Sequence, residues 1–286
     1  MKIVLSRKGF DAGYGGIPSP VLPGGQIISL PIPSSAGAPA QLCRGANFSL
    51  GEIMSDLSRG RLDGHTLVHL DPDLDGATIA RKPGWRPAFG QAGAAQAHLA
   101  NQGICAGDLF LYFGWYRPVE RCAARWQYVA NVPSFHGLFG WLQIDTIIDV
   151  DVVGAQNTPA WLADHPHVAH AGRFAGQRNA IYVARPDLKW GTVGKAVGGG
   201  GMFTRWSSVL KLTAPEQSRS VWRVPTWLEP RGARSALTYH GRADRWVKRG
   251  GELHLRTVAK GQEFVLDTDC YPEAIEWAQR LIEDHA

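Results

Sequence analysis

Two short segments place polar residues at the end of an apolar strand. LSRKGFD (5–11) contains Ser6, Arg7, Lys8 and Asp11, and HLDPD (69–73) contains His69, Asp71 and Asp73. Arginine and lysine bind phosphate oxygens, and a carboxylate can act as a general base or a metal ligand. We therefore expect one shared site. Its substrate-binding candidates are Ser6 and Arg7, with Lys8 as a further phosphate contact, and its catalytic candidates are Lys8, Asp11, His69, Asp71 and Asp73.

Two other motifs contain metal-ligating residue types. The run Asp71 to Gly76 matches the first half of a calcium loop, but Lys82 stands where the loop needs a bidentate glutamate, which excludes an EF-hand. A capped turn is the structural alternative for these carboxylates. HPH (165–167) could bind zinc, but the irregular start at Pro166 and the absence of a nearby cysteine favour hydrogen-bonded or solvent-facing histidines. No metal ligand is assigned, and the cofactor is left unknown.

A basic segment rich in aromatic residues lies near the C-terminus. Residues 219–256 hold nine basic residues against three acidic ones, with three tryptophans and Tyr239 interleaved. Arginine contacts phosphate and aromatic faces stack on bases, so this mixture is typical of a surface for nucleic acid or nucleotides. A solvated basic face with its tryptophans turned inward is the alternative. His240 is a further catalytic candidate, and Tyr239 and Arg242 are further substrate-binding candidates.

The elements that must position these residues are mostly strands. Apolar or alternating patterns predict strands at 1–5, 26–30, 66–70, 107–116, 126–130, 138–150, 179–184 and 263–266. Helices are predicted from Ser49 to Gly60, over 91–101 and after Pro272. Long segments rich in glycine and proline connect them. The predicted fold class is α+β, strand-rich, with peripheral short helices.

The length and composition limit the classes of protein to which the chain can belong. The chain has 286 residues and a net charge of +5, and it contains no apolar run near the ~20 residues that cross a bilayer. The N-terminus lacks the apolar stretch of a signal peptide. We expect a protein of the cytoplasm with no membrane partner.

Taken in order, the motifs resemble a bacterial and phage family, the third type of nucleotide modification associated domain. The segments that carry the resemblance are LSRKGFD (5–11), GGIPSP (15–20), SLPIP (29–33), HLDPD (69–73), FGQ (89–91), GDLFLYFGWYR (107–117), HGLFGWLQI (136–144), HPH (165–167), NAIYVA (179–184), YHGRADRW (239–246) and GQEFVLD (261–267). Because they span nearly the whole chain, we expect a single domain over residues 1–286. The resemblance implies modification of DNA bases or nucleotides, with DNA or a nucleotide as partner, and it gives no reaction.

The middle of the chain also resembles a PUA-like or EVE-like β-barrel, over residues 100–185. Such barrels enclose a flipped or modified base in an aromatic cage. The cage candidates are Trp115, Tyr116, Trp126, Phe135 and Trp141. Asn179 is a further substrate-binding candidate. Two alternatives stay open beside an enzyme acting on a base. One is a non-catalytic reader of modified bases, and the other is a nuclease directed at modified DNA, with a metal held by Asp71 and Asp73.

Overall fold

The computed structural model describes residues 1–286 except 46–47, 191–196, 233–234 and 260, and it is α+β, as predicted. The longer helices are α1 (Leu50–Ser58), α2 (Gly93–Asn101) and α5 (Glu273–His285), and the short ones are α3 (Val150–Val153) and α4 (Pro166–Ala169). The strands are β1 (Lys2–Arg7), β2 (Ser19–Val21), β3 (Ile32–Pro39), β4 (Arg44–Gly45), β5 (Phe48–Ser49), β6 (Leu67–His69), β7 (Ala88–Gln91), β8 (Leu109–Cys122), β9 (Arg125–Tyr128), β10 (Phe135–Asp149), β11 (Ala180–Ala184), β12 (Gly200–Met202), β13 (Val221–Val224), β14 (Trp246–Arg249), β15 (Glu252–Arg256) and β16 (Glu263–Asp267).

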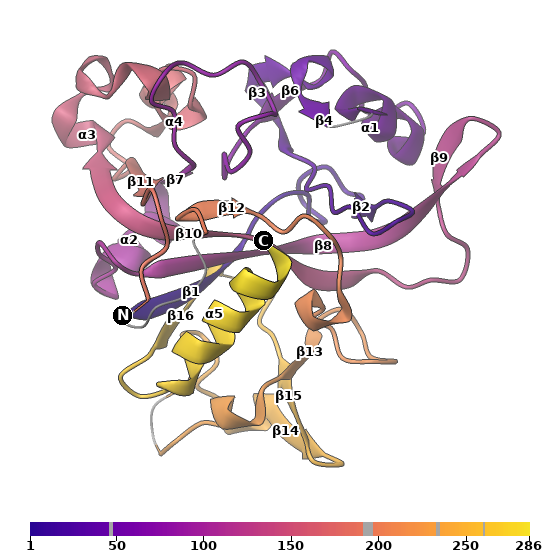
Figure 1. The fold of residues 1–286 in the computed structure, drawn as a ribbon, viewed down its shortest axis with the longest axis vertical. Helices are drawn as coiled ribbons and strands as arrows, with labels where there is room; N and C mark the ends of the chain where they lie inside the picture. The colour runs from indigo at the N-terminus through magenta and orange to yellow at the C-terminus, as the bar shows by residue number, and fades with distance from the viewer. Residues whose placement is uncertain (46–47, 191–196, 233–234, 260) are drawn as a thin grey trace.

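The central sheet is built on two long strands, β8 and β10, which cross the middle of the molecule (Figure 1). Its strand order is β16-β1-β8-β10-β11-β7, with β2 and β9 added to β8 and β12 added to β10. β1 pairs in parallel with β8 and antiparallel with β16. Side chains alternate between the two faces of a strand, so Ser6 of β1 lies in register with Tyr112 of β8 and Glu263 of β16 on one face. Arg7 points to the other face.

The sheet curls so that its two end strands approach each other. Gln91 on β7 donates a hydrogen bond from Nε2 to Glu263 Oε1 on β16 at 2.6 Å. Between these ends, Phe89 packs against the rings of Phe110, Tyr112 and Tyr182. No backbone pairing between β7 and β16 is found among the described residues, so the predicted closed barrel is not formed there. A side-chain contact and an aromatic core join the two ends instead.

The remaining elements cover this sheet from several sides. α1, β3 and β6 lie to one side of β8, and the small sheet β13-β15-β14 lies to the other (Figure 1). One face of α5 packs into the main core through Ala274, Ala278, Leu281 and Ile282. No helix of the described part of the chain is long and apolar enough to span a bilayer.

Two predictions of local structure were wrong. Residues 26–30 do not form a strand, since Ile27 makes only an isolated bridge to Val21 and the Leu30 N–H bonds the Ser19 hydroxyl instead of a neighbouring strand. The spacing of Ser49 and Glu52 predicts a capping box at the start of the first helix, and this also does not form, because the Ser49 side chain makes no cap hydrogen bond although α1 begins at the next residue.

Candidate metal centre

The Asp71 carboxylate lies at the centre of a cluster of imidazoles. It follows β6 in the chain, and its Oδ1 atom accepts the backbone N–H of Gly90 on β7 at 2.7 Å. Oδ1 also faces His165 Nε2 at 3.6 Å. Oδ2 faces His69 Nε2 at 3.7 Å and His167 Nε2 at 3.8 Å. Oδ1 is therefore held by a backbone hydrogen bond. Oδ2 points at two histidine nitrogens that lie beyond hydrogen-bonding distance.

The hydrogen bonds of His165 fix which of its nitrogens carries a proton. His165 caps the N-terminus of α4, and its Nδ1 atom accepts the backbone N–H of His167 at 3.3 Å. A neutral imidazole has one donor and one acceptor nitrogen, so Nε2 is the donor. This buried Nε2–H faces Asp71 and has no hydrogen-bond partner within range in the described part of the chain. His165 therefore directs an N–H dipole towards the carboxylate without forming a hydrogen bond to it.

The hydrogen bonds of His167 fix the opposite tautomer, with the proton on Nδ1. Asn179 donates from Nδ2 to the His167 carbonyl at 2.8 Å, which leaves its Oδ1 atom facing His167 Nδ1 at 2.6 Å. An amide oxygen only accepts, so Nδ1–H is the donor and the lone pair of Nε2 points towards Asp71 Oδ2. The ring stacks on Phe174 at 4.1 Å between centroids. It also lies against Gly90, where a Cβ atom would come within 2.2 Å of the ring.

Burial and neighbouring charge shift the pKa values of Asp71 and His167 in opposite directions. Burial alone raises the pKa of Asp71, but the neighbouring imidazoles of His165, His69 and His167 outweigh it, so the pKa lies well below its usual value. Burial lowers the pKa of His167 to about 4, against the opposing charge of Asp71. An ionised carboxylate thus faces a neutral imidazole lone pair.

His69, Asp71 and His167 have the composition of a metal site. Their ligand atoms all lie within 4.8 Å of one another. Zn²⁺ and similar cations bind nitrogen and oxygen at about 2.0–2.2 Å, which separates neighbouring ligand atoms by about 3.0–3.4 Å. The observed spacing of 3.7 and 3.8 Å from Oδ2 needs to close by a few tenths of an ångström. Two imidazoles and one carboxylate suit Zn²⁺, Fe²⁺ or Mn²⁺ and leave coordination positions open for water or substrate.

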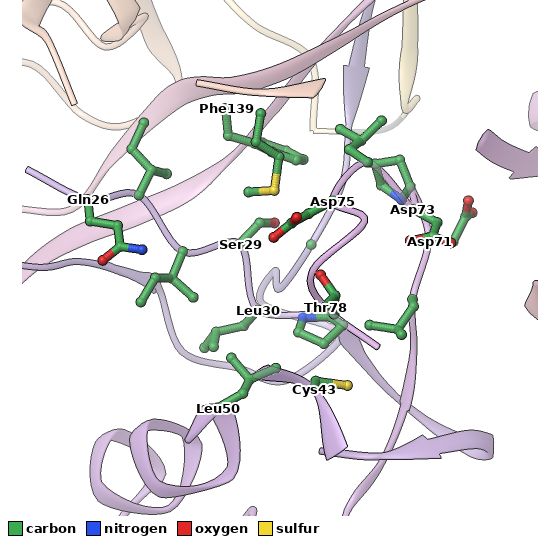
Figure 2. Close-up of a pocket in the computed structure, with 18 residues that line it drawn as sticks. Gln26, Ser29, Leu30, Cys43, Leu50, Asp71, Asp73, Asp75, Thr78 and Phe139 are labelled. Carbon is green, nitrogen blue, oxygen red and sulfur yellow. The ribbon is translucent and has the colours of Figure 1, made fainter. Parts of the chain in front are cut away.

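A cavity of about 120 Å³ reaches Asp71. Figure 2 shows Asp71 and Asp73 together on one side of it, with Gln26 on the other and Phe139 above. The Asp73 carboxylate is not free, because it makes an ion pair with Arg81 and accepts a hydrogen bond from Trp85 Nε1 at 3.3 Å. Burial raises its pKa, with Arg81 opposing.

A second buried polar cluster lies inside the curl of the sheet. Lys8 Nζ lies 2.9 Å from Glu263 Oε1, and the two side chains are only 8% and 1% exposed. The hydroxyls of Ser6 and Tyr112 and the second oxygen of Glu263 are buried and have no hydrogen-bond partner in the described part of the chain. Tyr112 feels the charges of both Asp71 and Glu263, which together with burial raise its pKa.

The other predicted catalytic residues lie apart from the metal centre. The Asp11 carboxylate accepts the backbone N–H groups of Gly13 and Tyr14, both at 2.7 Å, in a tight turn. His240 is buried, with Nδ1 facing the Thr238 carbonyl at 2.8 Å and its ring edge against Phe264. Burial lowers its pKa to about 4.

The predicted substrate-binding residues are dispersed. Tyr116 and Trp141 are buried in the main core, and Trp141 donates to the Gly198 carbonyl at 3.0 Å. Trp115 lies under Arg219, with 4.1 Å from the guanidinium carbon to the ring centroid. Tyr239 packs on His98, and the exposed Arg242 pairs with Asp244. Asn179 is the one member of this group that contacts the metal centre.

The sequence does not place Gln91 or Glu263 in a site. HPH offers His167 as a zinc ligand, but its separation of about one hundred residues from His69 hides the contact between the two. Glu263 has a usable signal, since it is an acid directly before the apolar run Phe264 to Leu266.

The fold and this cluster define a class: a strand-rich α+β protein with a curled central sheet and a histidine–carboxylate centre at the edge of that sheet. The chain belongs to the family of nucleotide modification associated domain 3, whose family model matches residues 2–267. The predicted family is thereby confirmed. No curated protein and no solved structure matches the chain.

Proposed function

We propose that the chain is a metal-dependent enzyme that modifies a nucleotide or a nucleobase, with a divalent transition-metal ion bound by His69, Asp71 and His167. One observation carries the proposal: the Oδ2 atom of Asp71 and the lone pair of His167 Nε2 face each other at 3.8 Å. Two acceptors in this position repel unless a cation lies between them. Membership of the family supports a nucleotide as the substrate class.

The surrounding residues support the same assignment. Metal-ligating histidines usually donate their second N–H to an oxygen that fixes the ring, and Asn179 takes this part for His167. The backbone N–H of Gly90 holds the other oxygen of Asp71, and His165 Nε2 lies 3.6 Å from that oxygen. His69 is 19% exposed, so solvent or substrate approaches from its side. A bound ion would activate a water molecule or polarise a substrate oxygen there.

The two alternatives have weaker support. A reader would use an aromatic cage, but Tyr116 and Trp141 are buried in the core. A nuclease with a metal on Asp71 and Asp73 would need the Asp73 carboxylate, which is paired with Arg81. Lys8, Asp11 and His240 do not reach the metal centre in the described contacts, so we leave them out of its chemistry.

Metal binding tests the proposal directly. Protein stripped with a chelator is titrated with Zn²⁺, Fe²⁺ and Mn²⁺, and we expect one ion per chain. Asn179→Ala should weaken binding by about 10- to 100-fold, as loss of a supporting hydrogen bond does, and Asp71→Asn by more. Asp75→Asn is the matched control, because Asp75 lines the same cavity but caps the Ala77 N–H. Absence of transition-metal binding by the wild type would refute the metal centre.

Activity is tested separately. Cells that express the wild type and Asp71→Asn are compared by mass spectrometry of their DNA nucleosides and free nucleotides. We expect a modified species that depends on Asp71. If the two profiles are identical in every fraction while the wild type binds metal, the centre is structural and the enzymatic proposal is wrong.

A further inference from the structure

A second cavity, of about 360 Å³, lies on the face of β1 opposite to Lys8. Arg7 points into it because successive side chains of a strand alternate between faces. Its polar lining comes from distant parts of the chain: Arg7, Asp11, Trp115, His136, Arg219, Ser220 and Thr257. Among the described residues, none lines both this cavity and the cavity at Asp71.

Arg7 is held rigidly at this cavity. Its two terminal nitrogens donate to the carbonyls of Ala259 and Val258, both at 3.2 Å. Its Nε atom is buried and has no hydrogen-bond partner in the described part of the chain. The guanidinium carbon lies 5.8 Å from the centroid of the Phe113 ring. A fixed guanidinium loses little conformational entropy when it binds an anion.

Positive charge exceeds negative charge here. Arg219 is the second guanidinium, lying over the Trp115 ring, and it and Arg7 repel each other. Asp11 is the only carboxylate in the described lining, and one of its oxygens already accepts two backbone N–H groups. Burial lowers the pKa of both arginines, with Asp11 opposing. The protein thus keeps two partly buried cations beside a single counter-charge.

The other polar groups of the cavity add donors. His136 Nδ1 accepts the indole N–H of Trp222 at 3.0 Å, so its Nε2 atom carries the proton. Burial and the two arginines lower the pKa of His136 to about 3, so the ring stays neutral. The indole nitrogen of Trp115 is buried without a partner in the described part of the chain. The lining therefore offers donors in excess of acceptors.

We propose that this cavity binds the phosphate group of a nucleotide through Arg7 and Arg219. Guanidinium forks match the geometry of phosphate oxygens, and partial burial strengthens the contact by excluding water. The choice of a nucleotide as the bearer of the phosphate rests on the proposed function, whereas recognition of the phosphate rests on the cavity alone. A free nucleotide and a nucleic-acid strand present the same group.

The test measures binding to chelator-treated protein, so its result does not depend on the metal centre. The probes are inorganic phosphate, a 5′-mononucleotide, the matching nucleoside without phosphate and a short single-stranded oligonucleotide. We expect the phosphate-bearing probes to bind and the nucleoside not to bind. Tight binding of the mononucleotide assigns a free nucleotide, and binding of the oligonucleotide alone assigns a strand.

Variants decide whether binding occurs in this cavity. Arg219→Gln should weaken phosphate binding by about 10- to 100-fold, the effect of one lost charge-assisted hydrogen bond. Arg7→Gln should do the same if it folds, and Arg219→Gln tests the site independently because that side chain makes no backbone contact described here. Arg121→Gln is the matched control, since Arg121 also lies over a tryptophan, Trp126, but outside the cavity.

Three outcomes would overturn the proposal. They are no binding of any phosphate-bearing probe, wild-type affinity in Arg219→Gln, or an equal loss in Arg121→Gln. Loss of metal binding in Asp71→Asn with phosphate binding retained would support two separate sites. Phosphate binding that holds while no modified nucleotide is found would leave this cavity assigned and the enzymatic proposal refuted.

Discussion

The buried pair of Lys8 and Glu263 provides the sharpest test of whether the polar end of β1 is structural or catalytic. Lys8→Met removes the ammonium group that lies 2.9 Å from Glu263 Oε1 and keeps most of the side-chain volume. Only the Gln91 N–H, at 2.6 Å, then faces a carboxylate that is 1% exposed. Breaking a buried ion pair by removing one partner costs about 3–5 kcal/mol in the free energy of unfolding. We expect a loss in this range.

The double variant Lys8→Met/Glu263→Gln separates the pair from simple packing. The new amide of residue 263 is neutral and can still accept the Gln91 N–H, so no unpaired charge is buried. We expect its free energy of unfolding to exceed that of Lys8→Met by about 2 kcal/mol, because the double variant buries no uncompensated charge. Glu263→Gln alone completes the cycle from which the coupling energy is obtained. The assay is urea unfolding followed by tryptophan fluorescence, which the 11 tryptophans make sensitive.

A control and a refuting result complete this test. Lys82 and Asp164 form an exposed pair at 3.8 Å, so Lys82→Met should leave the free energy of unfolding nearly unchanged. Strictly additive effects of Lys8→Met and Glu263→Gln would refute the account of a coupled buried pair. If Lys8→Met instead keeps wild-type stability but abolishes nucleotide modification, Lys8 is catalytic, as the sequence predicted.

Two further predictions concern packing and pH. Gly90→Ala places a Cβ atom 2.2 Å from the His167 ring, so we expect weaker metal binding, measured by titration. Gly172→Ala is the control: its added Cβ atom meets nothing within 4 Å, so this variant should bind metal normally. The pKa of His136 is about 3 in the folded state and 6.5 in the unfolded state, so the unfolded state takes up the proton first as the pH falls. The free energy of unfolding therefore decreases below pH 6.5, by up to about 1.4 kcal/mol per pH unit. His136→Gln should lose this part of the acid sensitivity. A difference in unfolding free energy between the two proteins that stays constant from pH 7 to pH 4 would contradict it.

Much of the secondary structure could be predicted because its signals are local. The strands β8 and β10 stand out as apolar and aromatic runs, and α5 shows the helical spacing of its apolar residues. The sheet order could not be predicted, because β1 pairs with β8 and β16, which lie over one hundred and over two hundred and fifty residues away. The ends of the curl meet through the aromatic core around Phe89 and a hydrogen bond between Gln91 and Glu263, and no local pattern indicates that these residues meet.

The site was half predictable for a related reason. His69, Asp71 and Asn179 follow from motifs, whereas their meeting with His165 and His167 depends on where α4 packs against β7. The expectation that Arg7 and Lys8 share one pocket conflicted with the alternation of side chains along a strand, which the sequence already contains. Arg7 faces the cavity with Arg219, and Lys8 faces Glu263.

Asp71 and Asp73 show why burial alone does not identify a functional carboxylate. They are two residues apart, both are largely buried, and both line the cavity of Figure 2. Asp73 uses both oxygens on protein donors, from Arg81 and Trp85, so its charge is fully matched within the fold. Asp71 gives only Oδ1 to a backbone donor and turns Oδ2 towards two imidazoles that do not reach it. Asp71 is the one of the two whose Oδ2 atom lies near two histidine nitrogens and has no donor from an arginine, and on this ground we propose Asp71, rather than Asp73, as a metal ligand.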